Sequence, residues 1–329
     1  MAQSAKSNAR AERVAKQGRE IQSEVDAIDA VKQTDDKKRG PIQAGQRDYP
    51  GHFPEQHQKK PGSEQDLAVQ PMFEAPEYLG SSKLKDMVAL ISGGDSGIGR
   101  AVAVLFAREG ADVAIAYLNE HEDANETKRA VEKEGRRCIL LPGEISDPVY
   151  CQDAVAQTVS QLGQLDILVN NAAFQEHTGN IEDLTDEHFD RTIKTNLYGY
   201  FYLARAAIPH LKEGSSILMT GSVTGLQGSK DLLDYSMTKG GIHAFARSLS
   251  SHLIDKGIRV NVVAPGPVWT PLNPADAPAG DVAKFGSKTP MRRAAQPEEI
   301  APAFVFLAAP SCSSYITGEI LPIIGGYGH

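Results

Sequence analysis

The sequence predicts an α/β fold in which a single doubly wound parallel sheet of about seven strands carries helices on both faces. Two observations predict this fold. From Leu84 onward, short apolar runs alternate with longer segments of helical periodicity, and strands joined through helices require right-handed crossovers and a parallel sheet. The first apolar run also ends in a glycine-rich turn that opens a helix, which is typical of the first unit of such sheets.

That first unit begins with the strand Val88–Ile91, which is too short and too apolar to be an amphipathic helix. The turn Gly93–Gly99 follows with the spacing Gly-x3-Gly-x-Gly, and a helix is expected over Arg100–Glu109. Glycines allow a sharp turn, a close approach of backbone to a ligand, and close packing of helix on strand. The helix N-terminus offers unpaired N–H groups to a phosphate, although a glycine-rich turn that binds nothing remains an alternative.

The later elements repeat the alternation of strand and helix. Strands are expected at Ala111–Tyr117, Arg137–Pro142, Leu165–Asn170, Ser216–Thr220, Ile258–Val263 and Glu319–Ile323. Helices are expected at Glu122–Glu134, Pro148–Leu162, Ile181–Lys194, Leu197–Leu211, Leu232–Lys256 and Pro297–Ala308. A ligand of such a sheet binds outside the carboxyl ends of the strands, where the glycine turn lies.

The composition limits the class of protein. The chain has 329 residues, of which 41% are hydrophobic, and a net charge of -8, so nucleic acid is not an expected partner. Three scattered cysteines, Cys138, Cys151 and Cys312, have no metal-ligand spacing and suggest free thiols in a reducing compartment. No apolar run is long enough to span a bilayer, and no apolar signal segment is found. We expect a cytoplasmic protein without a membrane or metal partner.

The N-terminal part differs from the rest and suggests three regions: an arm (residues 1–40), a strap (residues 41–83) and a catalytic domain (residues 84–329). Residues 1–60 carry 12 Lys and Arg against 9 Asp and Glu. Five apolar residues of this part fall at roughly helical spacing: Val14, Ile21, Val25, Ile28 and Val31. This narrow stripe indicates a marginal helix, which either docks on a partner or is a solvated tail. The strap is rich in Pro, Gln and Gly, and its interspersed aromatic residues predict an extended segment laid over a folded body.

Several polar residues are expected at the same edge of the sheet as the glycine turn. Tyr235 and Lys239 are four residues apart on the long helix and therefore share a face. Ser222 follows the strand that ends at Thr220. Asn196 lies where two helical patterns meet, which suggests either a hydrogen-bonding task or only a kink. Each residue alone has an ordinary structural explanation, but their convergence at one edge indicates a reaction site.

Together these residues resemble the short-chain dehydrogenase/reductase family, whose fold is Rossmann-like, from about Leu84 to Gly326. The matching pieces are Ser92-Gly93-x3-Gly97-Ile98-Gly99, Asn170-Asn171-Ala172-Ala173, Asn196, Ser222 thirteen residues before Tyr235, Lys239, and Pro265-Gly266-x3-Thr270. The run Tyr117–Asp123 and the preceding strap resemble a bacterial subgroup described as glucose/ribitol dehydrogenases or aldehyde reductases. The resemblance implies an NAD(P)-dependent oxidoreductase that interconverts a small alcohol or sugar and its aldehyde or ketone, and a homotetramer.

The resemblance also implies a role for each catalytic residue. Tyr235 would be the general acid/base, Ser222 would hydrogen-bond the substrate oxygen, Lys239 would hold the nicotinamide ribose and favour the phenolate, and Asn196 would hold a proton-relaying water. The implied cofactor-binding residues are Gly93, Ser96, Gly97, Ile98, Tyr117, Asn119, Glu144, Ile145, Asn171, Ala172, Ala173, Tyr235, Lys239, Pro265, Gly266, Val268 and Thr270.

Departures from the family pattern bear on the cofactor. Tyr117 stands where an Asp would hold the ribose 2′-hydroxyl of NAD, which disfavours strict use of NAD. Leu118 follows it rather than an Arg that would bind a 2′-phosphate, so the sequence leans only slightly towards NADP and allows use of both. Glu144 replaces the usual Asp, and Ala173 replaces the last glycine of Asn-Asn-Ala-Gly.

The substrate side is less defined by the sequence. The segment Thr270–Arg293, rich in Pro, Ala and Gly, suggests a lid. Candidate pocket residues are Phe174, Glu176, His177, Gln227, Trp269, Phe285 and Met291. Two other classes remain as alternatives: a dinucleotide-binding regulatory or interaction protein whose arm engages a partner, and a dehydratase or epimerase on the same fold. The intact catalytic set disfavours the first alternative, and the short C-terminal region disfavours the second.

Overall fold

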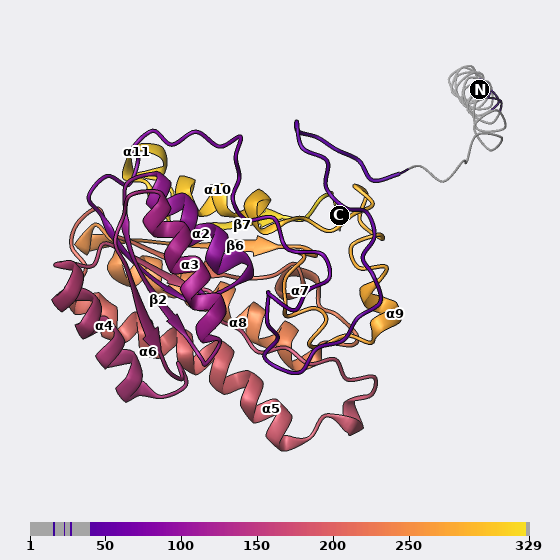
Figure 1. Ribbon diagram of the computed structural model, residues 1–329. Helices are drawn as coiled ribbons and strands as arrows, with labels where there is room; N and C mark the ends of the chain where they lie inside the picture. The colour runs from indigo at the N-terminus through magenta and orange to yellow at the C-terminus, as the bar shows by residue number, and fades with distance from the viewer. Residues whose placement is uncertain (1–15, 17–22, 24–26, 28–39, 327–329) are drawn as a thin grey trace, which may run out of the picture. The chain divides into compact units, whose positions relative to one another are not determined.

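The chain folds around a parallel sheet of seven strands in the order β3-β2-β1-β4-β5-β6-β7, as seen in the computed structural model (Figure 1). The model describes residues 16, 23, 27 and 40–326. The strands are β1 (Val88–Ser92), β2 (Asp112–Tyr117), β3 (Cys138–Pro142), β4 (Ile167–Asn170), β5 (Ser216–Thr220), β6 (Arg259–Pro265) and β7 (Ile320–Ile323). Each predicted strand is present, and the predicted doubly wound fold is confirmed.

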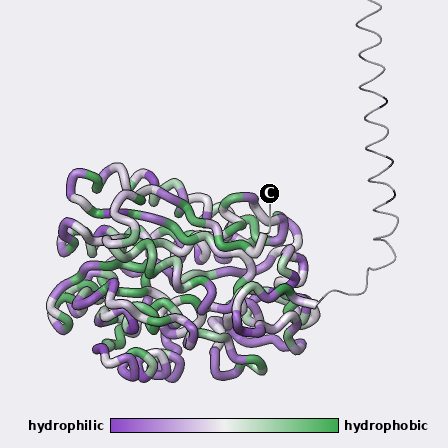
Figure 2. The backbone as a smooth tube through the Cα atoms, turned by 90° about the horizontal axis from the view of Figure 1, so that it is seen from above, coloured by the Kyte–Doolittle hydropathy of each residue, from purple (hydrophilic) through white to green (hydrophobic). Residues whose placement is uncertain are grey.

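The sheet is buried because its strands are apolar on both faces, as parallel strands covered by helices must be. Every residue of β1, β2, β4, β5 and β6 is buried. The hydropathy-coloured tube shows apolar residues along the strands inside and polar ones on the outer turns (Figure 2). The strand order reverses between β1 and β4, which is the switch point where such sheets hold their ligand.

The helices cover the sheet in two layers. The longer ones are α2 (Gly97–Arg108), α3 (His121–Lys133), α4 (Pro148–Leu162), α5 (Asp186–Ile193), α6 (Gly199–Ala207), α8 (Leu233–Leu253) and α10 (Pro297–Ala308). Short helices that the sequence does not predict are α7 (Thr224–Gln227), α9 (Ala279–Val282) and α11 (Pro310–Ser313).

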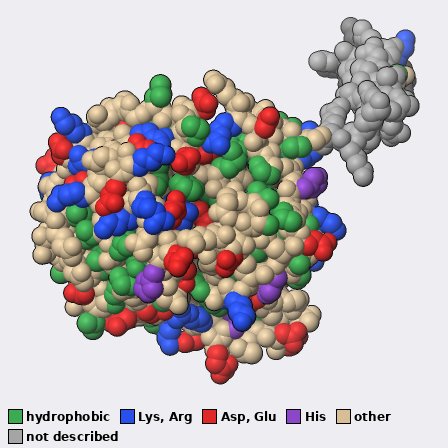
Figure 3. All heavy atoms as spheres, viewed as in Figure 1, with side chains coloured by type: hydrophobic (Ala, Val, Ile, Leu, Met, Phe, Trp, Pro, Cys, Tyr) green, Lys and Arg blue, Asp and Glu red, His purple; other side chains and the backbone are tan. Residues whose placement is uncertain are grey.

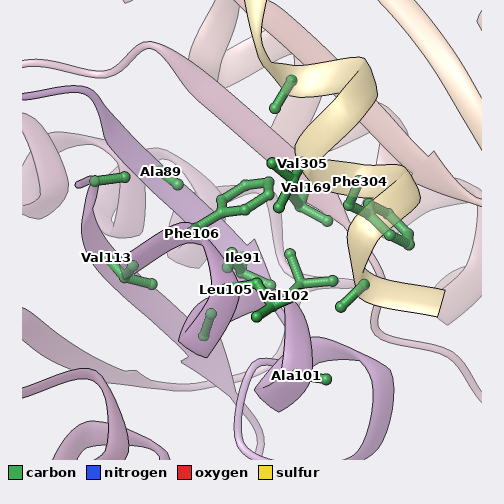
Figure 4. Close-up of a cluster of buried hydrophobic side chains, with 14 of the residues drawn as sticks. Ala89, Ile91, Ala101, Val102, Leu105, Phe106, Val113, Val169, Phe304 and Val305 are labelled. Atoms are coloured by element: carbon green, nitrogen blue, oxygen red, sulfur yellow. The ribbon is translucent and has the colours of Figure 1, made fainter. Parts of the chain in front are cut away.

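The core on one face lies between the sheet and α2, α3 and α10, and the core on the other face lies under α4, α6 and α8. In the first core, Phe106 of α2 and Phe304 of α10 lie among side chains of β1 and β4 (Figure 4). Both phenylalanines are fully buried. Burying such a ring contributes roughly 1.5–3 kcal/mol each.

The predicted break around Asn196 takes a different form. The expected helix Ile181–Lys194 is a 3₁₀ turn at Ile181–Asp183 followed by α5. A five-residue π-helical segment, Lys194–Tyr198, then joins α5 to α6 without interruption. A π-bulge widens one helical turn and commonly marks a functional position. Asn196 lies inside this widened turn.

The strap, residues 41–83, is described over its whole length and contains neither helix nor strand. It is ordered by contacts with the folded body: Phe53 and Leu67 are buried, and Glu64 is 1% exposed. The predicted amphipathic stripe Val14–Val31 lies outside the described residues. The division of the chain into arm, strap and catalytic domain stays a prediction.

Charged side chains of both signs are intermixed over the face shown in Figure 3. No helix among the described residues is long and apolar enough to cross a membrane. Within that same part of the chain, no group of three or more His, Cys, Asp and Glu side chains is placed to hold a metal ion.

Candidate active site

The glycine turn after β1 is shaped by close approaches that only glycine allows. Gly97 has φ +51°, and a Cβ there would lie 2.9 Å from Cγ2 of Thr270. A Cβ on Gly99 would lie 1.9 Å from the carbonyl oxygen of Gly93. These glycines therefore bring the amino-terminal end of α2 directly against the segment that follows β6. The cradle between them suits a flat, phosphate-bearing ligand.

One strap residue enters this turn, and sequence reasoning missed it. The Glu64 carboxylate accepts the Gly97 N–H at 2.6 Å and the Arg100 guanidinium at 2.6 Å. Ser96, the residue before α2, makes no capping bond with its side chain. Glu64 therefore caps α2 from a distant part of the chain, and no local pattern could reveal it.

A single pocket runs from this turn across the carboxyl ends of the strands. Its lining includes thirteen of the predicted cofactor residues: Gly93, Ser96, Gly97, Ile98, Tyr117, Glu144, Ile145, Asn171, Ala172, Ala173, Tyr235, Lys239 and Thr270. Four other predicted cofactor residues, Asn119, Pro265, Gly266 and Val268, are not among the lining residues. The pocket is also lined by residues that the sequence did not single out for it, among them Pro61, Gly62, Asp95, Glu120, Arg191, Thr195, Pro271 and Leu272. The glycine cradle in its lining fits the phosphates of a dinucleotide.

Tyr235, Ser222 and Lys239 lie close together, and Tyr235 and Lys239 line this pocket, whereas Ser222 is not among its lining residues. Tyr235 and Ser222 share a side-chain hydrogen bond. The Lys239 Nζ lies 5.3 Å from the centroid of the Tyr235 ring and donates to the Thr220 carbonyl oxygen at 2.7 Å. α8 supplies the tyrosine and the lysine, and the turn after β5 supplies the serine. The three groups predicted from separate motifs are therefore brought together.

Burial shifts the pKa values of both Tyr235 and Lys239. Burial raises the pKa of Tyr235 above its ordinary value, and the hydrogen bond to Ser222 partly opposes the rise. Burial lowers the pKa of Lys239 to about 7. We expected Lys239 to lower the pKa of Tyr235, but in the protein alone burial outweighs that effect. Tyr235 is therefore held as a neutral phenol, ready to donate a proton.

Asn196 is fully buried and fastens the loop that follows β4. Its Oδ1 accepts the Phe174 N–H at 2.8 Å, and its Nδ2 donates to the Phe174 carbonyl oxygen at 2.9 Å and to Thr238 Oγ1 at 3.1 Å. The side chain thus ties the loop to α8 one residue before Lys239. Its predicted role in holding a water stays a prediction.

The end of the pocket near β2 and β3 carries acidic groups. Burial, with a smaller contribution from the nearby Glu120, raises the pKa of Asp95 to about 6. Glu144 bonds Arg191 at 2.8 Å and the Ser146 N–H at 3.0 Å. Burial of the carboxylate acts to raise the pKa of Glu144, but these bonds lower it. Asp95 and Glu120 would repel a 2′-phosphate. Their presence therefore reduces the slight preference for NADP that we expected from Tyr117.

Of the candidate substrate residues, Phe174 alone lines the pocket. Trp269 is fully buried and stacks on Phe53 of the strap. His177 lies 2.6 Å from Asp276 of the predicted lid, so it fastens the lid rather than lining the pocket. The other candidates, Glu176, Gln227, Phe285 and Met291, do not line it either.

Comparisons with known proteins agree with this architecture. A family model described as enoyl-(acyl carrier protein) reductase matches residues 93–328. The chain is 52% identical over 275 residues to the uncharacterized oxidoreductase YhxC of Bacillus subtilis, covering 83% of this chain and 95% of that protein. It is 46% identical over 273 residues to NADPH-dependent aldehyde reductase 1, chloroplastic, of Arabidopsis thaliana, covering 81% and 95%. It is 46% identical over 284 residues to the glucose and ribitol dehydrogenase of Daucus carota, covering 84% and 97%.

Solved structures show the same fold. A short chain dehydrogenase from Burkholderia cenocepacia in complex with NADP matches with a TM-score of 0.69 and 34% identity, covering 74% of this chain and 98% of that one. A 3-ketoacyl-(acyl-carrier-protein) reductase from Brucella melitensis complexed with NADH matches with a TM-score of 0.67 and 31% identity, covering 74% and 98%. Both cofactors therefore occur among proteins of this architecture.

Proposed function

The chain belongs to the short-chain dehydrogenase/reductase family and is an NAD(P)-dependent oxidoreductase, and we propose that it interconverts a small alcohol or sugar with its aldehyde or ketone. The observation that carries the proposal is that Tyr235 and Lys239 line the pocket that begins at the glycine turn, with Ser222 hydrogen-bonded to Tyr235 beside them. When bound there, NAD(P)H supplies the hydride and NAD(P)⁺ accepts it.

Tyr235 is the acid/base of the proposed reaction. In reduction, its hydroxyl donates a proton to the carbonyl oxygen while the carbonyl carbon receives the hydride, and the product is the alcohol. Ser222 holds that oxygen through its own hydroxyl, since it already bonds Tyr235. In oxidation, the phenolate takes the proton back. Protonated Lys239 stabilises the phenolate of Tyr235. Because the pKa of Lys239 is about 7, this stabilisation is gained or lost near neutral pH.

We propose that either cofactor is used. Tyr117 supplies no carboxylate for the 2′-hydroxyl of NAD, whereas Asp95 and Glu120 disfavour the 2′-phosphate of NADP. These opposing features support dual use rather than strict selection of one cofactor.

We also propose a homotetramer in the cytoplasm. Tyr198, the last residue of the π-helical segment, and Phe201 of α6 are 46% and 44% exposed, and Met237 of α8 is 50% exposed. Aromatic and methionine side chains are enriched where protein surfaces associate, which supports burial of this face between subunits. The free thiols Cys138, Cys151 and Cys312 support a reducing compartment.

The test is oxidation of NADPH and NADH by the wild-type protein with a panel of small aldehydes, ketones and keto sugars. We expect turnover with at least one small carbonyl compound, at rates within about tenfold for the two cofactors. Binding of cofactor without turnover of any member of the panel would contradict the proposed substrate class.

A further inference from the structure

The strap contacts the lid segment, defined as residues 270–293, although the two segments are far apart in the sequence. Figure 1 shows the indigo strap running beside α9 and the orange turns that follow β6. The Gln58 N–H donates to the Pro274 carbonyl oxygen at 2.9 Å. A Cβ on Gly62 would lie 2.8 Å from the Pro271 carbonyl oxygen. The backbones of the two segments therefore touch directly.

The strap and the lid segment share a small apolar core. Phe53 stacks on Trp269 with ring centroids 3.7 Å apart and an interplanar angle of 8°. Val282 is fully buried against them, and Leu67 is 4% exposed. The Trp269 Nε1 donates to the Val69 carbonyl oxygen at 2.8 Å. Since Phe53, Leu67 and Val69 all belong to the strap, removing it would expose the tryptophan from which the lid segment starts.

A third segment, the loop 171–178 after β4, is fastened to both. Lys60 of the strap donates from Nζ to the Gln175 carbonyl oxygen at 2.6 Å and pairs with Glu176 at 2.8 Å. The buried Asp276 of the lid segment accepts the His177 N–H at 2.7 Å and a bond from the Gln175 amide. Each of these three segments, the strap, the loop and the lid segment, is thus hydrogen-bonded to the other two.

This junction borders the pocket that Tyr235 and Lys239 line. Pro61 and Gly62 of the strap, Leu272 of the lid segment and Phe174 of the loop line the same pocket as Tyr235. Lys60 also lies 5.1 Å from the centroid of the Phe174 ring, on which it packs as a cation on an aromatic face. The pocket is therefore lined partly by a segment that lies outside the matched family region, residues 93–328, and its residues Pro61 and Gly62 also lie beside Glu120.

We propose that the strap is a substrate-specificity element: residues 53–69 hold the lid segment closed and Lys60 holds Phe174 in the pocket wall, so that small carbonyl compounds are accepted and bulky ones are rejected. This inference rests on the proposed function for its substrates. A bulky substrate can enter only if the lid segment moves, and that movement pulls Val282 away from the apolar core that it shares with Phe53 and Trp269. The specificity is therefore set by contacts that do not touch the reacting atoms.

The test compares Phe53→Ala with Glu55→Ala, a control at an exposed strap residue. For both variants and the wild type, kcat/KM is measured with propanal and with 2-naphthaldehyde, and hydrogen exchange is followed over residues 270–285. In Phe53→Ala we expect the ratio of kcat/KM for the bulky over the small aldehyde to rise by about tenfold or more. We also expect faster exchange in the lid segment and a KM for the cofactor within about twofold of wild type. Glu55→Ala should match wild type.

A folded Phe53→Ala protein with unchanged aldehyde ratio and unchanged exchange would overturn the inference. If Phe53→Ala does not fold, Lys60→Gln removes the ion pair to Glu176 and the cation packed on Phe174, and should change the ratio in the same direction. An unchanged ratio in Lys60→Gln would then overturn it. If the wild type reduces no carbonyl compound, the proposed function fails, whereas faster exchange in Phe53→Ala still shows that the strap holds the lid segment.

Discussion

Replacing Asn196 by alanine tests how the loop after β4 is held. The side chain is fully buried and makes three hydrogen bonds, two of them to the backbone of Phe174. Each bond contributes about 1 kcal/mol, so Asn196→Ala should lower the free energy of unfolding by about 3 kcal/mol. For a domain of this size that corresponds to a decrease in Tm of roughly 5–10 °C.

Thermal denaturation followed by circular dichroism measures this decrease. Asn180→Ala is the matched control, because Asn180 is exposed and makes a single side-chain bond, to Asp183. We expect Asn180→Ala to melt within about 1 °C of wild type, as surface substitutions usually do. Asn196→Asp places a buried carboxylate oxygen against the Phe174 carbonyl oxygen, so its Tm should be no higher than that of Asn196→Ala. An Asn196→Ala protein that melts with the wild type would refute the hydrogen-bonding role.

Two other predictions concern the glycine turn and the lid segment. Gly97→Ala should raise the Kd for NAD(P)H by about tenfold or more, measured by fluorescence titration, because its Cβ would meet Thr270. Gly135→Ala is the control for backbone strain alone, because Gly135 also has a positive φ, +79°, and a Cβ there would meet no atom within 4 Å. The hydrogen bond to Asp276 raises the pKa of His177, so this stabilisation is complete below the unfolded value near 6.5 and is lost as the pH rises through the folded value. Between pH 6 and pH 9 the wild type should therefore lose about 1–3 °C more in Tm than His177→Gln, and equal pH profiles would exclude this linkage.

The strands were predictable because each is an apolar run bounded by turn residues, and a parallel sheet leaves that signature in the local sequence. The position of the candidate catalytic residues at the sheet edge was predictable from local patterns too. The spacing of Tyr235 and Lys239 places them on one helix face, and Ser222 follows the end of β5. The form of the helix at Asn196 was not predictable, because a π-helical turn leaves the periodicity of its neighbours almost unchanged.

The strap shows the limit of such prediction. Its aromatic residues suggested an extended segment against a folded body, but its partners lie far away in the chain. Glu64 bonds Gly97 and Arg100, and Phe53 stacks on Trp269. Neither contact has a periodicity or a local motif, so only the folded structure reveals that the strap reaches the reaction site.

The central claim is that Tyr235 exchanges the proton with the substrate, and Tyr235→Phe tests it most directly. We expect turnover of a small aldehyde to fall by about 10²-fold or more, while the Kd for NAD(P)H, measured by fluorescence titration, stays within about twofold. Tyr202→Phe, a half-buried tyrosine that does not line the pocket, should keep wild-type turnover. Wild-type turnover in Tyr235→Phe would contradict the claim, whereas its loss with cofactor binding intact is the result that the structure predicts.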